Sequence, residues 1–385
     1  MPMDGDFDVA VIGAGPAGAA TARQLSQAAC RVLLLERSRF DAPRIGESLA
    51  PATQPLLAQL GVWQQFLALS PLPSYGTRSA WGSTELLGHS HLLSPYGCGW
   101  HLDRLAFDRM LADAAADAGA QLRSGTTCVG CNRSAAGPWE LRLSEGGRSA
   151  PGTIRARALV DATGRTAQLG RHLGAERIVF DRLVAVAALF GQVDVTAEGY
   201  VLVEAIADGW WYSAPVAPGH MIAMLMTDSD ICRRAEMASP ERWRELLAQA
   251  PETAARASGV TIWGPRVFSA ASQRLHRTEH DAPWIAVGDA CLAVDPISGS
   301  GVVRALRSAQ AATRTTLALL EADPSRVIPA YESDGDIECS RYLQERALYY
   351  AVERRWEGSP FWSRRLRATT DSRAPTRASA PTAEA

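Results

Sequence analysis

The stretch FDVAVIGAGPAGAATARQLSQAACRVLLLE, residues 7–36, decides the fold. Its first six residues form a short, continuously apolar run of the kind found in buried parallel strands. A glycine-rich turn and an alanine-rich segment follow, and a second apolar run ends at Glu36. This order predicts a strand, a helix and a second, parallel strand, which is the repeating unit of a doubly wound α/β sheet.

The turn inside this stretch carries Gly13, Gly15 and Gly18 in G-x-G-x-x-G spacing. With this spacing the first glycine allows a tight turn, the second lets the backbone approach a pyrophosphate, and the third lets the helix pack closely on the strand. The helix N-terminus offers unpaired N–H groups to phosphates. Glu36 stands where an acidic residue can accept hydrogen bonds from a ribose. Together these features predict a dinucleotide site.

Composition excludes several other classes of protein. The chain has 385 residues, enough for one large or two ordinary domains, and its formal net charge of −2 argues against a nucleic-acid partner. No apolar run reaches the roughly 18 residues of a membrane span. The acidic N-terminus is expected to lead directly into a strand, and no secretory signal is predicted. The seven cysteines are scattered, which favours free thiols and a cytoplasmic location.

The rest of the chain alternates between helical and strand periods. Helical spacing is found in four segments: 103–123, 239–257, 302–322 and about 329–356. In the second of these, Ser239 is the predicted N-cap and Pro240 the first helical residue. Strand patterns fill three segments: 124–160, 158–165 and 178–227. The strands of 178–227 predict a second, mostly antiparallel layer.

Three glycine- or acid-bearing motifs stand in order along the chain: GAGPAG at 13–18, VDATGR at 160–165 and GDACLAVDPISGSG at 288–301. HLDRLAFDRMLADAA lies between the first two. This order resembles the single-component flavoprotein monooxygenases of the para-hydroxybenzoate hydroxylase fold, and the flavin-dependent halogenases that share their FAD module. The resemblance runs from residue 7 to about residue 366 and implies FAD as the cofactor.

We therefore predict a mixed α/β fold, in which a Rossmann-like FAD-binding domain holds an inserted, mainly antiparallel-sheet substrate domain and is followed by C-terminal helices. The predicted FAD-binding pieces are 1–75, 101–177 and 276–325. The predicted substrate-domain pieces are 76–100 and 178–275. Residues 326–367 would form the C-terminal helices, and 368–385 have the composition of a disordered tail.

The resemblance also implies roles for individual residues. Asp289 would hold the ribityl hydroxyls of FAD, the turn from Pro296 to Gly301 would pass close to the isoalloxazine ring, and Arg104 would contact the phosphates. A helix that starts after this turn would favour the negative charge of the reduced flavin. The complete predicted FAD set is Gly13, Gly15, Pro16, Ala17, Gly18, Glu36, Arg37, Arg44, Glu47, Ser48, Arg104, Asp161, Gly164, Gly288, Asp289, Pro296, Gly299, Ser300, Gly301 and Val302.

A closer resemblance lies in four strings: RIGESLAPATQPLLAQLGVW (44–63), SAWGS (79–83), GCGWHLDR (97–104) and YYAVERRWEGSPFWSRR (349–365). They are similar to flavoproteins that hydroxylate a tryptophan side chain of a partner polypeptide during tryptophylquinone formation. This resemblance implies an FAD-dependent monooxygenase that hydroxylates an aromatic, indole-like substrate, free or peptidyl, through a flavin C4a-hydroperoxide. The alternative is a maturation partner whose main task is to bind an immature quinone-cofactor protein.

The basic residues bear on the choice between oxygenation and halogenation. All 39 of them are arginine. Halogenases of the family need a lysine to carry the oxidised halogen, and their W-x-W-x-I-P motif reads WWYSAP here at 210–215. We therefore expect direct oxygen transfer rather than halogenation or a simple reductase activity. NAD(P)H is the expected reductant, and with one dinucleotide fingerprint it would bind transiently or act through a separate flavin reductase.

The candidate catalytic residues are His101, Tyr212 and Pro296, with His101 as acid or base or, alternatively, as a structural histidine. The candidate substrate-binding residues are Trp81, Trp100, Trp210, Trp211 and Tyr212, and core packing is the alternative for each. Trp210 and Tyr212 would share one strand face. The expected partner is an aromatic small molecule or a tryptophan-containing protein.

No metal site is expected from the cysteines. Cys128 and Cys131 form a C-x-x-C pair, but no second pair or nearby histidine completes a four-ligand site. In a regular strand these two side chains would also point to opposite faces.

Overall fold

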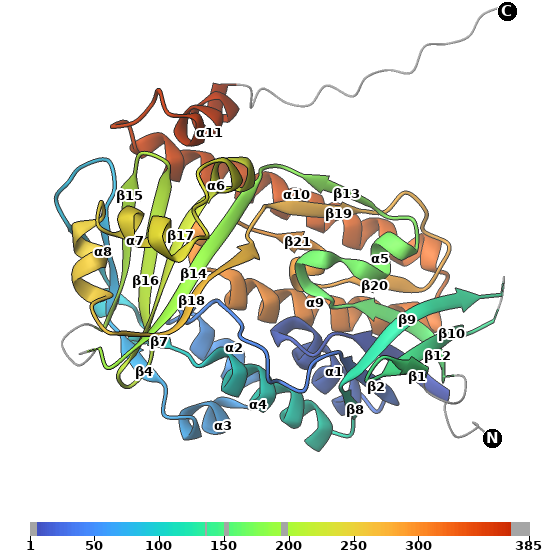
Figure 1. Ribbon diagram of the computed structural model, residues 1–385. Helices are drawn as coiled ribbons and strands as arrows, with labels where there is room; N and C mark the ends of the chain where they lie inside the picture. The colour runs from blue at the N-terminus through green and yellow to red at the C-terminus, as the bar shows by residue number, and fades with distance from the viewer. Residues whose placement is uncertain (1–5, 135–136, 150–153, 194–198, 371–385) are drawn as a thin grey trace, which may run out of the picture.

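The computed structural model describes residues 6–134, 137–149, 154–193 and 199–370. Two sheets organise the molecule, one with a parallel core at the lower right of Figure 1 and a seven-stranded one at the left. Helix α10 (Pro324–Val352) connects them, because Ile328 near its start packs with the first sheet and Tyr350 near its end packs with the second. The predicted mixed α/β fold with C-terminal helices is confirmed.

The first sheet has a parallel core in the order β8 (Gln121–Ser124), β2 (Val32–Glu36), β1 (Asp6–Ile12), β12 (Ile154–Asp161) and β20 (Trp284–Ala286). Val9 and Val11 of β1 pack on one face with helices α1 (Pro16–Gln27), α4 (Arg104–Asp117) and α9 (Gly301–Glu321). Ala10 and Ile12 pack on the other face. Burial on both sides is why this strand is continuously apolar.

An antiparallel meander extends the first sheet and covers its second face. It consists of β9 (Thr126–Arg133), β10 (Trp139–Glu145) and β11 (Arg148–Ser149), and β10 pairs with the start of β12. Trp139 and Leu141 of β10 are buried against Ala10 and Ile12. The meander thereby occupies the place that a second layer of helices takes in a doubly wound fold.

The second sheet has the strand order β18-β14-β17-β16-β15-β5-β6. Its strands are β5 (Gly76–Ala80), β6 (Leu87–Ser90), β14 (Leu183–Gly191), β15 (Tyr200–Ile206), β16 (Gly209–Ala217), β17 (His220–Asp228) and β18 (Val260–Ser269). Neighbours are antiparallel except β5 and β15, which run parallel. The predicted antiparallel layer is therefore present, and residues 76–80 join it from far earlier in the chain.

Two predicted helices differ from those observed. The segment 239–257 is divided into α7 (Pro240–Leu247) and α8 (Pro251–Arg256), because a proline cannot continue a helix that precedes it. Ser239 caps α7 as predicted, and its hydroxyl accepts from the Arg242 N–H at 3.3 Å. The segment 103–123 leaves the helix after Asp117, where Gly119 adopts a φ of +106° and leads into β8.

The long C-terminal helices lie near their predicted positions. Helix α10 begins at Pro324, five residues earlier than predicted, because the Asp323 carboxylate accepts from the Ser325 N–H at 3.0 Å and forms an N-cap. Helix α11 (Pro360–Thr370) includes the first three residues of the predicted tail. Residues 371–385 lie outside the described part of the chain. In the described part, no helix combines the length and apolar character that crossing a membrane requires.

The remaining elements are short. The strands are β3 (Ser48–Leu49), β4 (Leu72–Ser74), β7 (Gly99–His101), β13 (Glu176–Val179), β19 (Gln273–His276) and β21 (Leu292–Ala293). The α-helices are α2 (Thr53–Gln59), α3 (Trp63–Ala68), α5 (Gln168–His172) and α6 (Ser229–Arg234). The 3₁₀ turns are η1 (His91–Leu93), η2 (Gly164–Thr166), η3 (Gly288–Ala290) and η4 (Pro296–Ser298).

Candidate active site

A cavity of about 640 Å³ lies between the two sheets. The carboxyl ends of the parallel strands β1, β2, β12 and β20 form one side of it, and β16, β17 and the end of β18 form the other. Ligands of doubly wound sheets bind outside the carboxyl ends of the parallel strands. The cavity has the size and position of a cofactor and substrate site.

The glycine turn forms part of the cavity wall. Gly13 has a φ of +109°, and a Cβ there would overlap the Ala162 carbonyl. A Cβ on Gly18 would overlap the Gly13 carbonyl. A Cβ on Gly15, in contrast, would meet no atom of the described chain within 4 Å and would point into open space. This open cradle at the start of α1, whose N-terminus has no side-chain cap, fits a pyrophosphate.

Charged side chains line the cavity next to the cradle. Arg44 contacts Glu36 at 3.1 Å and Asp108 at 2.6 Å, and Arg104 contacts Asp108 at 3.2 Å. The contacts with these two arginines offset the free-energy cost of burying the Asp108 carboxylate. Glu36 also accepts from the Ala14 N–H at 3.1 Å, so its carboxylate is fixed at the end of β2. The residue types fit the ribose and phosphate contacts predicted for FAD.

The late glycine motif forms the next part of the wall. Asp289 lies 3.3 Å from Arg165, and its carboxylate remains partly exposed to the cavity. Gly299 has a φ of +59°, and a Cβ on Gly299 or Gly301 would meet no atom within 4 Å. Helix α9 starts at Gly301 without a side-chain cap. A flat ring could therefore lie against this backbone beside a helix N-terminus, as predicted for the isoalloxazine.

Glu47 is a buried carboxyl group without a partner in this wall. Its side chain is 2% exposed, and neither oxygen has a hydrogen bond partner in the described residues. Its backbone carbonyl accepts from the Leu102 N–H at 2.7 Å, which fixes the loop to β7. Burial raises the pKa of Glu47 to about 7, although the nearby Gly46 backbone N–H and the Arg104 charge oppose the shift. A bound ligand with an N–H or O–H group would complete its hydrogen bonding.

The structure brings most of the predicted FAD set to the cavity wall. The residues that line it are Gly13, Gly15, Pro16, Ala17, Gly18, Glu36, Arg37, Arg44, Glu47, Ser48, Arg104, Gly164, Asp289, Pro296, Gly299, Gly301 and Val302. Asp161, Gly288 and Ser300 lie behind it. Asp161 is fully buried and accepts from the Thr163 N–H at 2.9 Å and the Gly170 N–H at 2.7 Å, so its place is in the support of the adjacent loop.

Of the predicted substrate-binding residues, Tyr212 lines the cavity. Trp100, Trp210 and Trp211 are buried in the core, and the partly exposed Trp81 packs against it. Trp81 and Trp210 share an edge-to-face contact with ring centroids 6.2 Å apart, outside the cavity. Trp211, on the opposite strand face, packs on Trp243 at 4.9 Å. Trp100 packs with other aromatic rings below the loop that carries Glu47. Tyr212 is thus the one of these five residues that lines the cavity in the described part of the chain.

His101 is buried behind the cavity wall. It lies in β7, where its backbone pairs with Ser48 and Leu72. Burial lowers the pKa of His101 to about 4, so the imidazole is neutral at pH 7. Its side chain is not among the described residues that line the cavity, and neither ring nitrogen has a hydrogen-bond partner among them, so its role as acid or base stays a prediction.

Sequence reasoning missed the apolar end of the cavity. Met224, Met226 and Phe268 line it beside Tyr212. Met224 is the cross-strand partner of Tyr212, so both side chains lie on one face of the sheet. The alternation of HMIAMLM could have marked Met224 and Met226 as one face, but it could not show which face the cavity occupies.

The structure corrects the expected orientation of the two cysteines in C-x-x-C. A β-bulge lies opposite the Arg142–Leu143 step, so Cys128 pairs with Leu143 and Cys131 pairs with Leu141. Both cysteines consequently face the same core rather than opposite sides of the sheet. Cys128 also lines the cavity. In the described part of the chain, no group of histidine, cysteine and acidic side chains is placed to hold a metal ion.

A parallel sheet whose carboxyl edge carries an open glycine cradle, continuous with a backbone-lined slot, defines an FAD-binding flavoprotein. The chain belongs to the family described as FAD binding domain, whose model matches residues 6–341. It is an FAD-dependent oxidoreductase of the superfamily that includes flavin-dependent halogenases and hydroxylases.

Three known proteins illustrate this membership. The putative FAD-dependent oxidoreductase LodB of Marinomonas mediterranea is 32% identical over 368 residues, which cover 93% of this chain and 96% of LodB. The myxobacterial chondrochloren halogenase CndH has a TM-score of 0.84 at 25% identity, with 94% of this chain and 86% of CndH covered. The peptidyl tryptophan dihydroxylase QhpG has a TM-score of 0.74 at 25% identity, with 94% and 78% covered.

The glycine cradle makes opposite predictions for two alanine substitutions. Gly15→Ala should change the free energy of unfolding of the FAD-free protein by less than about 0.5 kcal/mol but weaken FAD binding at least about tenfold, because its methyl group fills the cradle. Gly18→Ala should cost about 1–3 kcal/mol of stability, because its methyl group overlaps the protein's own backbone. Urea unfolding and calorimetric FAD titration measure the two effects. Unchanged FAD affinity in Gly15→Ala would place the pyrophosphate elsewhere.

The raised pKa of Glu47 makes a prediction for stability against pH. The folded protein holds a proton between pH 4.5 and about 7 that the unfolded chain releases, so the contribution of Glu47 is present below pH 4.5 and lost as the pH rises through 7. Relative to the parent, Glu47→Gln should gain on the order of 2–3 kcal/mol over this window in the FAD-free protein. Urea unfolding at several pH values measures the gain.

Glu353 supplies a control, because its pKa is shifted in the opposite direction to that of Glu47. Burial raises its pKa, but hydrogen bonds from Arg355 and from the Gly82 N–H outweigh burial and lower it overall. Glu353→Gln should therefore be less stable than the parent above the unfolded-state pKa, and this deficit should shrink as the pH falls through the folded-state pKa. A difference between Glu47→Gln and the parent that is the same at every pH would show that the pKa of Glu47 is equal in the folded and unfolded states, which contradicts the raised value.

Proposed function

We propose that this enzyme is a monooxygenase that hydroxylates an aromatic ring of the indole type, either in a small molecule or in a tryptophan side chain of a polypeptide. The observation that carries the proposal is the apolar end of the cavity. There Tyr212, Met224, Met226 and Phe268 face the turn that begins at Pro296. An aromatic ring bound between this wall and a flavin would be shielded from water.

Two polar side chains in this wall suit an indole. Glu47 has free acceptor oxygens, and an indole ring presents one N–H donor and no acceptor. Acceptance of that proton would raise the electron density of the ring and favour attack by an electrophilic oxygen. Burial raises the pKa of Tyr212 well above its usual value, so its phenol stays neutral and can donate a hydrogen bond.

The residues that line the cavity suggest which tasks fall to the cofactor and which to the protein. Bound FAD in its reduced form supplies the activation of O₂, from which one oxygen atom passes to a ring carbon and the other leaves as water. Gly15, Arg104 and Asp289 would hold the cofactor, and Pro296 would border the space between ring and substrate. NAD(P)H would provide the electron pair, directly or through a separate flavin reductase.

Halogenation is the second candidate, because CndH and this chain share one fold at a high TM-score. The residue types of the sequence argue against it. The family halogenases resembled by this chain use a lysine amine to carry oxidised halogen, and all 39 basic residues here are arginine. A guanidinium remains protonated at pH 7 and is a poor nucleophile toward oxidised halogen. The description of QhpG as a peptidyl tryptophan dihydroxylase supports oxygen transfer to an indole ring.

The reaction product distinguishes these functions. We expect the FAD-loaded protein, supplied with NAD(P)H, isotopically labelled O₂, bromide and a tryptophan-containing peptide or free indole, to add one labelled oxygen atom to the substrate, as detected by mass spectrometry. A parallel reaction with added flavin reductase identifies the route of reduction. A brominated product would refute the hydroxylase proposal and show that the protein is a halogenase. Peroxide as the sole product with every aromatic substrate would refute both.

A further inference from the structure

Helix α10 presents one polar stripe toward the cavity. Tyr342, Arg346 and Tyr350 are spaced four residues apart, so they lie on one face of the helix. Tyr342 and Tyr350 are 5% and 1% exposed, although each carries a hydroxyl group. Buried polar groups of this kind need partners, and those of the stripe lie at the junction of the two sheets.

Tyr350 contacts the cavity wall through Asp295. Its hydroxyl donates to Asp295 Oδ2 at 2.8 Å and accepts from Trp210 Nε1 at 3.1 Å. An indole N–H can only donate, so the phenol proton is free to point at Asp295. Asp295 is fully buried, and burial raises its pKa. The donor from Tyr350 opposes that shift and stabilises the ionised carboxylate.

Tyr342 holds the backbone of the same segment, and Arg346 supports Ser272, the hydrogen-bond partner of Tyr342. The Tyr342 hydroxyl accepts from the Asp295 N–H at 2.8 Å and shares a hydrogen bond with Ser272 Oγ at 2.6 Å. Arg346 donates to Ser272 Oγ at 3.0 Å and to Asp181 Oδ2 at 2.5 Å. Asp295 is thus fixed by α10 at both its backbone and its side chain.

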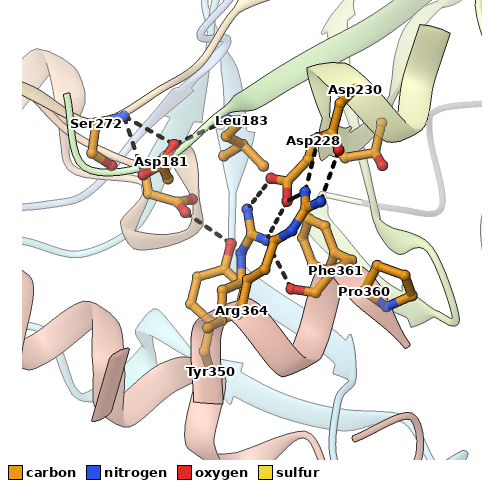
Figure 2. Close-up of polar contacts among 12 residues, drawn as sticks. Asp181, Leu183, Asp228, Asp230, Ser272, Tyr350, Pro360, Phe361 and Arg364 are labelled. Carbon is orange, nitrogen blue, oxygen red and sulfur yellow. Dashed lines mark hydrogen bonds and ion pairs between the residues drawn. The ribbon is translucent and has the colours of Figure 1, made fainter. Parts of the chain in front are cut away.

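The far side of Tyr350 is anchored by helix α11. The Arg365 guanidinium lies over the Tyr350 ring at 5.0 Å and donates to Asp228 Oδ1 at 2.8 Å. Arg364 donates to Asp228 and Asp230 at 2.8 and 2.7 Å. Figure 2 shows Tyr350 beside these contacts, where the two C-terminal helices meet the second sheet. The stripe therefore has a rigid support in the ends of β17 and α6.

Asp295 connects this support to the slot predicted for the flavin ring. It lines the cavity, and its Oδ1 accepts from the Ile297 N–H at 3.0 Å, which caps the turn η4. The turn continues through Gly299 to the start of α9 at Gly301, and both glycines line the cavity. Whatever fixes Asp295 consequently fixes the backbone against which the ring would lie.

We propose that Tyr342 and Tyr350 are positioning residues of the flavin site, which hold the turn 295–301 at a set distance from the second sheet through Asp295. The C-terminal helices then support the active-site wall from behind, and neither tyrosine is among the residues that line the cavity. This inference concerns the flavin environment alone, so it does not depend on whether the substrate is hydroxylated or halogenated.

The test is Tyr350→Phe in the full-length, FAD-loaded protein. Removal of the hydroxyl leaves Asp295 Oδ2 and Trp210 Nε1 without their partners, so the turn should loosen. We expect the FAD dissociation constant to rise about tenfold, the visible circular dichroism of the bound flavin to change, and its reduction potential to shift. Tyr342→Phe should change the same three quantities in the same direction, and it replaces Tyr350→Phe if that variant fails to fold.

Tyr331→Phe is the matched control. Tyr331 lies on the same helix, and its hydroxyl donates to the Ala286 carbonyl at 2.7 Å, away from the turn. Tyr331→Phe should lose stability to a similar extent but keep the flavin dichroism and reduction potential of the parent. If Tyr350→Phe and Tyr342→Phe also keep the dichroism, potential and FAD affinity of the parent, the stripe is a support of the fold and the proposal is wrong.

Discussion

The backbone contact between the glycine turn and the end of β12 is the constraint on which the site depends. Three hydrogen bonds cross the carboxyl edge of the sheet, from Gly13 N–H to the Leu35 carbonyl at 2.8 Å, from Ala162 N–H to the Ile12 carbonyl at 2.9 Å, and from Val287 N–H to the Asp161 carbonyl at 2.9 Å. They connect four strand ends into one continuous ledge. The ledge can form only because no Cβ stands at Gly13 or Gly18.

The ledge divides the cavity into two chemically different halves. Next to the glycine cradle, Glu36, Arg44, Asp108 and Arg104 alternate in charge, so each buried carboxylate has a guanidinium beside it. Toward the second sheet the wall is apolar, and Glu47 stands in it without a partner. The first half suits a charged, highly oxygenated ligand, and the second suits an aromatic ring. One cavity can therefore hold a charged ligand and an aromatic ring side by side, because polar groups surround the first and apolar groups surround the second.

The motifs with backbone requirements were the part of the site that the sequence could predict. Glycines at 13, 15 and 18 and in the turn after Pro296 have few alternative explanations, since each serves a tight turn or an open backbone surface. Side-chain surfaces were harder to predict. Trp210 and Tyr212 share a strand face, but that face extends past the cavity, so Trp210 reaches Tyr350 instead of the ligand space. Periodicity identifies a face but not its neighbours.

The β-bulge in β9 illustrates a second limit. One extra residue reverses the alternation, so the strand rule placed Cys128 and Cys131 on opposite faces while the bulge places them on one. Nothing in CVGC signals the bulge, because it depends on how β10 pairs with β9. Local rules fail where a partner strand sets the register.

The contacts of the C-terminal helices likewise depend on partners that are distant in the sequence. Tyr342 lies in no motif, and the string 349–365 that contains Tyr350 does not point to Asp295. About fifty residues separate the two tyrosines from Asp295, yet their hydroxyl groups fix its backbone and carboxylate. The glycines that leave the turn open to a flavin also leave it without side chains to hold itself in place. A turn that must be bare on its ligand side has to be held from behind, and α10 is the element that lies behind it.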